Sequence, residues 1–429
     1  MLNEKIICSI DIGSSKIATL ITSIGLNNRI NLIGASSVTS KGIRKGQVVD
    51  IESASQAIIE SIESAERMAG ISISSAYISI GGPHIESINT HAVVAVSKAG
   101  SDIDEKDLAR LNEIAQAVSL PSSRQILHSL PISYTIDGQH GIKNPLNMAG
   151  TRLESETHII SGSSVAISNL IKCLQKVDVE IEEIIFSGIA SSGSVLTPTE
   201  KELGVVLLDI GYDTTDVVIF VDGAITYSSV LPIGARYITN DLAIGLKVSL
   251  ESAEKIKLKL SDPELTKIDP EFIDKNQKNK NNPDLLDLKT LGISEETEKI
   301  SIKSAKDTII RSRSREIFEL IQKELKKSGH GLHIPFGVVI SGGGALTVGL
   351  SDVAKYILGF PARVGAPDRF TGLSDEVDSP EFAVSSGLIL YAMENQDIEK
   401  QHNFQILGRN LPLKKWFDRI RKFIQQFLP

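Results

Sequence analysis

The chain has 429 residues, about three times the length of a typical single domain, so roughly two to four lobes are expected. Hydrophobic residues make up 41% and charged residues 23%, an ordinary composition for a soluble globular protein. The formal net charge of -8 argues against a general nucleic-acid binder. The two cysteines, Cys8 and Cys173, are too few for a disulfide framework or a thiolate metal cluster, which fits a reducing compartment.

The hydropathy pattern predicts a protein that does not span a bilayer. No apolar run approaches the roughly 18 to 20 residues that a transmembrane helix needs. Residues 1–11 have acidic interruptions and no apolar core long enough for a signal peptide. We therefore expect an intracellular protein, and only its last residues indicate a membrane surface.

Apolar runs separated by polar or Gly-bearing turns predict strands at Lys5–Ile12, Ile17–Thr22 and Ile30–Ser37. A helix at about 51–69 and a strand at Ala76–Ile80 follow. We interpret residues 84–162 as an insertion. It is predicted to contain a strand at His91–Val96, a helix near 104–118, an extended segment around 125–136, a loop at 137–150 and a strand near 152–160. The main pattern resumes with a helix at about 165–177 and a strand at 181–186.

The second half of the chain repeats the strand-rich opening. Strands are predicted at Leu203–Ile210, Asp216–Val221 and Ala224–Leu231. The elements expected after them are helices at 234–245, 249–260 and 301–327, a buried strand at Phe336–Ile340 and a last helix at 380–394. Residues 395–411 are predicted to be a polar linker, and residues 412–428 form a tail of different composition.

Two turns with the same opening separate pairs of predicted strands. They are Asp11-Ile12-Gly13-Ser14-Ser15-Lys16 and Asp209-Ile210-Gly211-Tyr212-Asp213-Thr214-Thr215-Asp216. Glycine and small hydroxyl residues let main-chain N–H groups approach a phosphate, Lys16 would add positive charge, and Asp11 would hold Mg²⁺ through water. Each turn alone is also compatible with a plain hairpin. Their repetition indicates two similarly built lobes that hold one phosphate chain between them.

A third turn, Ser341-Gly342-Gly343-Gly344-Ala345, follows a buried strand and opens a helix. This sequence suits close main-chain approach to a nucleoside or phosphate, although a tight strand–helix turn would explain it equally well. It has neither the Lys-Ser/Thr ending of a Walker sequence nor the G-x-G-x-x-G dinucleotide pattern.

The order of the three turns resembles the actin/Hsp70-like ATPase superfamily, and the chain is more similar still to the bacterial division family FtsA. Further matching segments are Lys41–Gly46, Gly141–Pro145, Gly188–Ser192 and Leu231–Gly234. The resemblance implies a two-lobed actin-like α/β fold with an inserted small α+β domain and a C-terminal amphipathic helix. It divides the chain into lobe 1 (1–83, 163–200 and 361–394), the inserted domain (84–162), lobe 2 (201–360, with a subdomain at about 232–305), a linker (395–411) and a membrane-targeting helix (412–429).

The resemblance also implies that ATP and Mg²⁺ bind between the lobes. The phosphates are assigned to Gly13, Ser14, Ser15, Lys16, Gly211, Thr214 and Thr215, and magnesium, through water, to Asp11 and Asp209. The adenosine is assigned to Glu254, Lys257, Gly342, Gly343 and Gly344. A solvated helix face is the alternative explanation for Glu254 and Lys257.

Two departures from the family pattern predict slow or absent ATP hydrolysis, so no catalytic residue is assigned. Tyr212 and Asp213 stand where the family usually has glycines. Their β-carbons would restrict positive φ, and the Asp213 carboxylate would lie near phosphate or face magnesium. Around Phe186-Ser187-Gly188 the chain lacks the carboxylate that orients water in Hsp70-like proteins. ATP would then act mainly as a conformational and assembly ligand.

The tail has the pattern of an amphipathic helix. One stripe holds the apolar residues Leu413, Trp416, Phe417, Ile420, Phe423, Ile424, Phe427 and Leu428, and the other face holds Lys414, Lys415, Arg419, Arg421 and Lys422. Aromatic residues opposite cations favour an anionic bilayer surface. A docked terminal helix and a basic partner-binding helix are the alternatives.

Arg313 and Glu316 match the helix that receives the C-terminal peptide of the tubulin-like protein FtsZ in the FtsA family, although an i,i+3 surface ion pair would have the same spacing. The leading hypothesis is a filament-forming adaptor that tethers FtsZ to the inner face of the membrane at the division septum, with self-association and other division proteins as further partners. The alternatives are a small-molecule kinase or phosphatase on the same core, and a scaffold such as the pilus protein PilM.

Overall fold

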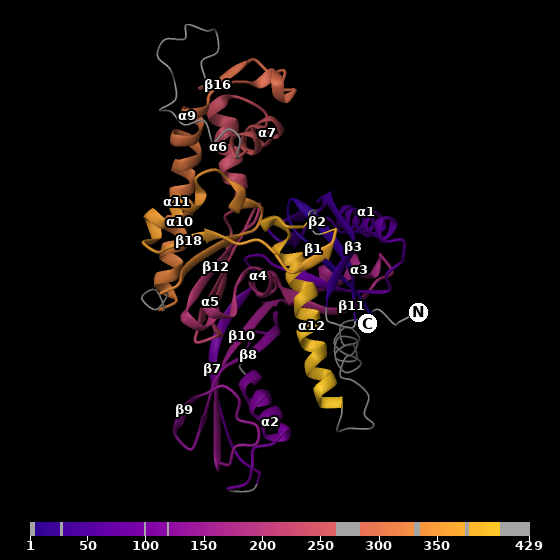
Figure 1. The fold of residues 1–429 in the computed structure, drawn as a ribbon, viewed down its shortest axis with the longest axis vertical. Helices are drawn as coiled ribbons and strands as arrows, with labels where there is room; N and C mark the ends of the chain where they lie inside the picture. Colours follow the sequence, from indigo (N-terminus) through magenta and orange to yellow (C-terminus); the bar gives the residue numbers. More distant parts are fainter. Residues whose placement is uncertain are drawn as a thin grey trace. The chain divides into compact units, whose positions relative to one another are not determined.

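A computed structural model describes residues 5–25, 29–97, 100–117, 120–262, 284–329, 335–373 and 377–403. The chain divides into two compact units, Met1–Leu390 and Tyr391–Pro429. The predicted membrane-binding helix at 412–429 lies outside the described residues. The first unit contains two α/β lobes and an inserted α+β domain, as the sequence predicts (Figure 1).

The sheet of lobe 1 has six strands in the order β11-β6-β1-β2-β3-β19. Their bounds are β1 (Lys5–Ile12), β2 (Lys16–Ile24), β3 (Ile30–Thr39), β6 (Ser75–Ile80), β11 (Glu180–Phe186) and β19 (Phe370–Gly372). The strands β1, β2 and β3 pair antiparallel, whereas β6 runs parallel to both β1 and β11. Because parallel strands end at the same sheet edge, the carboxyl ends of β6 and β11 lie beside the β1–β2 turn.

The helices of lobe 1 are α1 (Ile51–Ala69), α3 (Ser164–Gln175), α4 (Ser187–Val195) and α12 (Ala383–Asn403). The side chain of Asp50 caps the first turn of α1, and Gly70 ends the helix with φ 70°. Helix α12 crosses α4 at Gly387, where an added Cβ would lie 1.7 Å from the Ala190 carbonyl oxygen. The predicted linker 395–411 is wrong at its start, because α12 continues to Asn403. Its Gln, Glu and Lys residues favour helix, and the first glycine is Gly408.

The inserted domain is a four-stranded sheet covered by one helix. The sheet order is β7-β10-β8-β9. The elements are β7 (Glu86–Ala95), α2 (Glu105–Gln116), β8 (Arg124–Ile136), β9 (Gln139–Ile142) and β10 (Arg152–Ser163). Strand β9 lies within the predicted loop 137–150, where Asp137 (φ 46°) and Gly138 (φ 87°) form a tight hairpin turn from β8. The α2 face packs Leu111 and Ala115 against the sheet.

The sheet of lobe 2 has five strands in the order β14-β13-β12-β17-β18. The strands are β12 (Val205–Ile210), β13 (Thr215–Val221), β14 (Ala224–Leu231), β17 (Gly337–Ser341) and β18 (Ala362–Val364). The helices are α5 (Pro198–Leu203), α6 (Arg236–Leu246), α7 (Leu250–Leu260), α10 (Arg311–Lys327) and α11 (Leu350–Leu358). Its short elements are β15 (Leu285–Asp287), β16 (Lys299–Ser301) and α9 (Ile302–Ser304), and lobe 1 has the short strands β4 (Ile43–Arg44) and β5 (Gln47–Val48).

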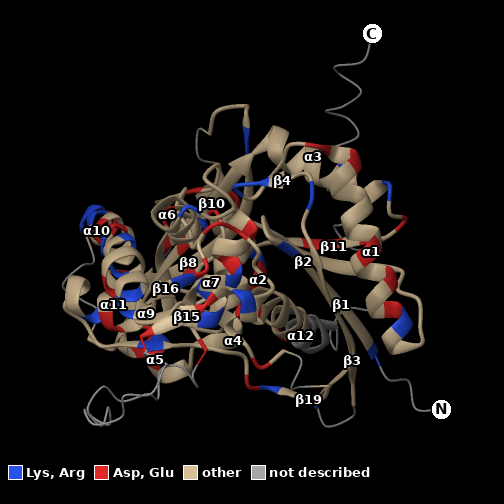
Figure 2. Ribbon diagram, turned by 90° about the horizontal axis from the view of Figure 1, so that it is seen from above, with Lys and Arg blue, Asp and Glu red and all other residues tan. Residues whose placement is uncertain are grey.

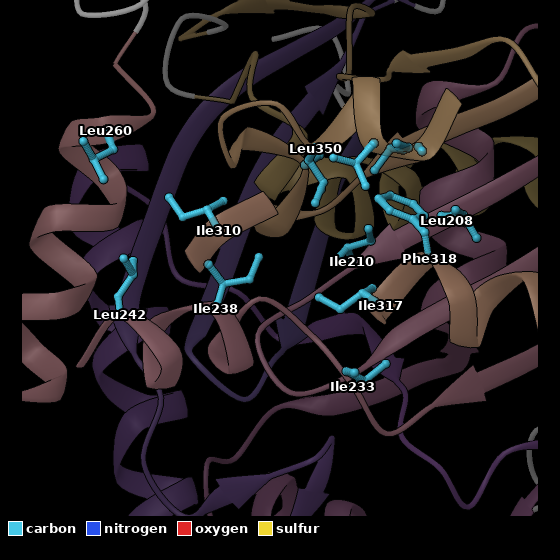
Figure 3. Close-up of a cluster of buried hydrophobic side chains, with 14 of the residues drawn as sticks. Leu208, Ile210, Ile233, Ile238, Leu242, Leu260, Ile310, Ile317, Phe318 and Leu350 are labelled. Atoms are coloured by element: carbon cyan, nitrogen blue, oxygen red, sulfur yellow. The ribbon is translucent and has the colours of Figure 1, made fainter. Parts of the chain in front are cut away.

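The core of lobe 2 is formed where β12 and β17 pack against α6, α7, α10 and α11 (Figure 3). Leu208, Ile210 and Phe318 are almost fully buried there. The predicted helix 301–327 is interrupted by a π-helical turn, Ala305–Ile310, before α10 begins. Ala305 and Ile310 are both buried although they are five residues apart, which is the spacing of a π turn.

Candidate nucleotide site

The two glycine turns have the same construction in the two lobes. The Gly13 N–H donates to the Lys16 carbonyl at 3.0 Å, and the Gly211 N–H donates to the Thr214 carbonyl at 2.8 Å. A Cβ on Gly13 would lie 2.9 Å from that Lys16 oxygen, and one on Gly211 would lie 3.2 Å from the Thr214 oxygen. Close approach of the main chain therefore requires glycine at position 13 and leaves little room for a Cβ at position 211.

Three aspartates gather at the ends of β1, β12 and β13. Asp209 and Asp216 are cross-strand partners and are 7% and 5% exposed. The pKa of Asp209 is raised well above 3.8, first by burial and then by the charges of Asp216 and Asp11. Burial, followed by the charge of Asp11, raises the pKa of Asp216 to about 7, and burial also raises the pKa of Asp11. The Oδ2 atom of Asp209 is enclosed and has no hydrogen-bond partner.

Lys16 is the cation assigned to the phosphates, and it lies close to this group. Its Nζ pairs with Glu381 Oε2 at 3.1 Å and lies 3.8 Å from the centre of the Phe382 ring. Burial lowers the pKa of Lys16, while the Glu381 charge opposes that effect. The Ser14 hydroxyl accepts a hydrogen bond from the Gly46 N–H at 2.9 Å. Glu381 and Phe382, which are distant in sequence, therefore hold Lys16 together with the neighbouring aspartates.

Tyr212 and Asp213 cause no backbone strain, which corrects the expectation that they would conflict with positive φ. Neither is among the described non-glycine residues with positive φ. Asp213 is buried, accepts the Lys45 N–H at 3.1 Å and pairs with Arg236 at 3.3 Å. The Arg236 guanidinium lies 5.6 Å from the Tyr212 ring centre. Asp213 therefore joins the second turn to the Lys41–Gly46 segment of lobe 1.

The remaining hydroxyl residues assigned to the phosphates differ in burial and in the hydrogen bonds that they make. Thr215 is buried and its hydroxyl donates to the Ile233 carbonyl at 2.7 Å, so this hydroxyl faces away from the turn's open side. Thr214 is half-buried, and Ser15 is exposed. We therefore regard Thr214 as the better hydroxyl candidate of the second turn.

The triple-glycine turn lies against the aspartates. Gly342 has φ 77°, and an added Cβ would lie 2.2 Å from Asp209 Oδ1. A Cβ on Gly344 would lie 2.5 Å from Ile210 Cγ2. The turn continues as a 3-10 turn, Gly343–Leu346, and the α-helix begins only at Leu350, because Gly349 at φ 72° separates the two.

Glu254 and Lys257, assigned to adenosine, form a closed cluster on α7. The Lys257 ammonium donates to Glu254 Oε2 at 2.8 Å and contacts Thr239 Oγ1 at 3.0 Å. The Thr239 hydroxyl donates to the same Glu254 oxygen at 2.6 Å. Lys257 is 6% exposed, so the solvated-face alternative does not describe it.

Arg313 makes the i,i+3 ion pair with Glu316 at 2.6 Å, and it also binds Asp241 of α6. Its Nε and Nη2 atoms donate to the two Asp241 oxygens at 2.6 and 2.9 Å, a bidentate geometry that joins α10 to α6. Sequence spacing gave no sign of Asp241, because the two residues are 72 positions apart.

Asp216 and Ser187 are candidate site residues to which the sequence analysis assigned no role. The Ser187 hydroxyl donates to Asp216 Oδ2 at 2.5 Å. The expectation that no carboxylate lies near the Phe186–Gly188 turn is therefore wrong, because β13 supplies one from the other lobe. The available signal was an acidic residue at the start of an otherwise apolar strand, Asp216–Val221.

Comparisons with known proteins show which family the chain belongs to. The family model for cell division protein FtsA matches residues 206–387, and that for the SHS2 domain inserted in FtsA matches residues 82–161. The cell division protein FtsA of Borreliella burgdorferi is 36% identical over 401 residues, covering 93% of this chain and 94% of the relative. The Escherichia coli protein of the same name is 30% identical over 394 residues, covering 92% and 91%.

Solved structures of more distant proteins share the fold. The PilM–PilN type IV pilus biogenesis complex matches with a TM-score of 0.61 at 16% identity, covering 90% of this chain and 98% of that one. MreB5 of Spiroplasma citri bound to AMPPNP matches with a TM-score of 0.51 at 15% identity, covering 92% and 99%.

The two lobes, the paired turns and the inserted domain define an actin-like α/β protein. Within that class, the chain belongs to the family of the bacterial cell division protein FtsA, and its role is in cell division. Among the described residues, none of the helices combines the length and hydropathy that crossing a bilayer requires.

Proposed function

We propose that the chain binds ATP with Mg²⁺ between its lobes and that the nucleotide controls its assembly. The observation that carries this proposal is the group of Asp11, Asp209 and Asp216, in which Asp209 and Asp216 are buried and an Asp209 oxygen has no hydrogen-bond partner. Buried carboxylates without a compensating cation are unfavourable. The group is therefore suited to a hydrated cation that arrives with a phosphate chain.

The residues of the two turns fit this ligand. Lys16, the Ser14 hydroxyl and the main-chain N–H groups of the turns would hold the phosphates. When bound, Mg²⁺ neutralises charge on the phosphate oxygens. In the described part of the chain, no three His, Cys, Asp or Glu side chains are grouped closely enough to hold a metal by themselves. Asp11 and Asp209 would accordingly contact the ion through water, as magnesium sites often do.

Asp216 is our candidate for the group that orients the attacking water. It is buried, its pKa is near 7, and the Ser187 hydroxyl fixes one of its oxygens. A general base is most effective when its pKa lies near the working pH. Hydrolysis would still be slow, because the cation that acts on Asp11 and Asp209 within the described residues is Lys16, and Lys16 is paired with Glu381.

Titration with a fluorescent ATP analogue, with and without Mg²⁺, tests the nucleotide site. Lys16→Ala should weaken binding about 10- to 100-fold, because a hydrogen bond to a charged group contributes about 1.5–3 kcal/mol. Lys143→Ala is the matched control, since that lysine pairs with Glu202 on an exposed surface. Equal affinity of the wild-type and K16A chains would overturn the assignment.

At the level of the cell, we propose that the protein tethers FtsZ polymers to the cytoplasmic face of the inner membrane and assembles into filaments at the septum. Membership in the FtsA family supports this role over the kinase, phosphatase and pilus-scaffold alternatives. The amphipathic sequence at 412–429 supports the membrane contact.

Co-sedimentation with anionic vesicles tests the tether, comparing the full chain with one truncated after Arg409. The full chain should pellet with the vesicles, and the truncated chain should remain soluble. A full chain that stays in solution would mean that the tail is a docked or partner-binding helix.

The surface of α10 supports binding of the FtsZ C-terminal peptide. Figure 2 shows Lys and Arg residues along this helix. Tyr356 of α11 is 74% exposed, and the Arg315 guanidinium lies 5.9 Å from its ring centre. Exposed aromatic residues beside arginine are typical of binding hot spots. Tyr356→Ala should weaken peptide binding measured by fluorescence anisotropy, whereas Lys355→Ala, on the same helix, should not. Equal effects would remove α11 from the peptide site.

A further inference from the structure

The inserted domain reaches the nucleotide site through one buried histidine. His128 lies on β8 of that domain and is 5% exposed. Its Nε2 accepts a hydrogen bond from the Phe186 N–H at 3.0 Å. Phe186 is fully buried and is the last residue of β11 in lobe 1. A strand of the inserted domain therefore fixes the main chain at the end of a lobe 1 strand.

The residue after this contact belongs to the site. Ser187 begins α4, and its hydroxyl donates to Asp216 Oδ2 at 2.5 Å. Space around the turn is limited, because a Cβ on Gly188 would lie 2.6 Å from the Phe186 ring and 2.7 Å from Val218. A shift of the Phe186–Ser187 peptide would thus move the Ser187 hydroxyl away from Asp216.

We infer that His128 is a positioning residue for the nucleotide site: by accepting the Phe186 N–H, it holds the Ser187 hydroxyl against Asp216. This inference rests on the proposed role of Asp216. The hydrogen bond requires a neutral imidazole whose Nε2 carries no proton. Burial lowers the pKa of His128 to about 4, so the ring is neutral at physiological pH. Through His128, the inserted domain would then help to position residues of the nucleotide site.

A second histidine of the inserted domain provides a matched comparison. His158 lies on β10, and its ring nitrogens are 2.6 Å from Asn89 Oδ1 and 2.9 Å from Ser228 Oγ on β14. It is 1% exposed. His158 therefore joins the inserted domain to lobe 2. Replacing it loosens the domain contact without removing the acceptor for Phe186.

Three variants of the full chain distinguish loss of the hydrogen bond to Phe186 from general loosening of the inserted domain. His128→Leu removes the acceptor, His128→Gln restores an acceptor at similar reach, and His158→Leu changes a contact between the inserted domain and lobe 2. Hydrogen exchange of peptides covering 184–190 measures protection of the turn. ATP titration and single-turnover hydrolysis measure affinity and rate separately.

We expect H128L to lose protection at this turn and to lower the hydrolysis rate constant at least about fivefold, with ATP affinity within about twofold of wild type. H128Q should restore both properties, and Ser187→Ala should reproduce the loss of rate. The inference is overturned if H128L keeps its protection or its rate, if H128Q rescues neither property, or if H158L has the same effect as H128L.

Failure of the proposed function gives a different result. A wild-type chain that binds no ATP overturns the nucleotide site, while the exchange pattern still decides whether His128 holds Phe186. A wild-type chain that binds ATP but never hydrolyses it overturns the role of Asp216 and, with it, this inference.

Discussion

Replacing Asp216 with asparagine should stabilise the nucleotide-free chain, by an amount that grows with pH. Burial raises the pKa of Asp216 from 3.8 to about 7. A carboxyl group with a raised pKa in the folded state binds its proton more tightly there, so the free energy of unfolding falls as the pH rises from about 4 to 7. Above that window the full penalty is about 4 kcal/mol, taking 1.36 kcal/mol for each pKa unit.

Asparagine keeps an oxygen that can accept the Ser187 hydroxyl, and it leaves no cavity. The stability gained by Asp216→Asn should therefore be about 2 to 3 kcal/mol larger at pH 8 than at pH 5. Urea unfolding without nucleotide, followed by circular dichroism, measures this difference. Asp222→Asn, on the exposed turn after β13, is the matched control. Equal gains for D216N at both pH values, or a loss at pH 8, would refute the reasoning.

Three further predictions concern the surroundings of the site. Glu381→Gln removes the charged partner of Lys16 and should tighten ATP binding about two- to fivefold. Calorimetric titration measures this affinity, and weaker binding would contradict the prediction. Asp213→Ala should destabilise the chain by about 1.5–3 kcal/mol more than Asp213→Asn, because asparagine keeps an oxygen that can accept the Lys45 N–H. Equal unfolding midpoints of the two variants would argue against that hydrogen bond between the lobes. Gly387→Ala should destabilise the chain by about 3 kcal/mol or more through overlap with α4. Gly193→Ala should have little effect in the same unfolding assay, because its added Cβ would lie 4.0 Å from the nearest atom, an ordinary van der Waals distance.

Sequence patterns predicted the two glycine turns and their flanking strands well. The Asp-Ile-Gly turns are hairpins in which the glycine, its hydrogen-bond partner and the flanking strands lie within a few residues. Apolar alternation and glycine breakers report such short-range geometry directly. The same reasoning failed for the π turn before α10, because a single extra residue in a helical repeat changes no residue type.

The parts that could not be predicted are contacts between distant segments. Ser187 meets Asp216, Phe186 meets His128, and Arg313 meets Asp241 only after the lobes and the inserted domain have folded together. A serine after a strand or an acid within one has many structural explanations when it is seen alone. Such pairs follow from the packing of whole elements, which periodicity in one segment does not specify.

The aspartates that destabilise the empty chain should also determine how strongly ATP and Mg²⁺ stabilise it. A ligand that binds only the folded state raises the free energy of unfolding in proportion to the logarithm of its concentration over its dissociation constant. Part of that affinity would come from relieving the repulsion among Asp11, Asp209 and Asp216. D216N should therefore start from a higher melting temperature and gain less from ATP and Mg²⁺ than the wild-type chain. A full wild-type gain in D216N would mean that the Asp216 charge does not interact with the bound nucleotide or its cation.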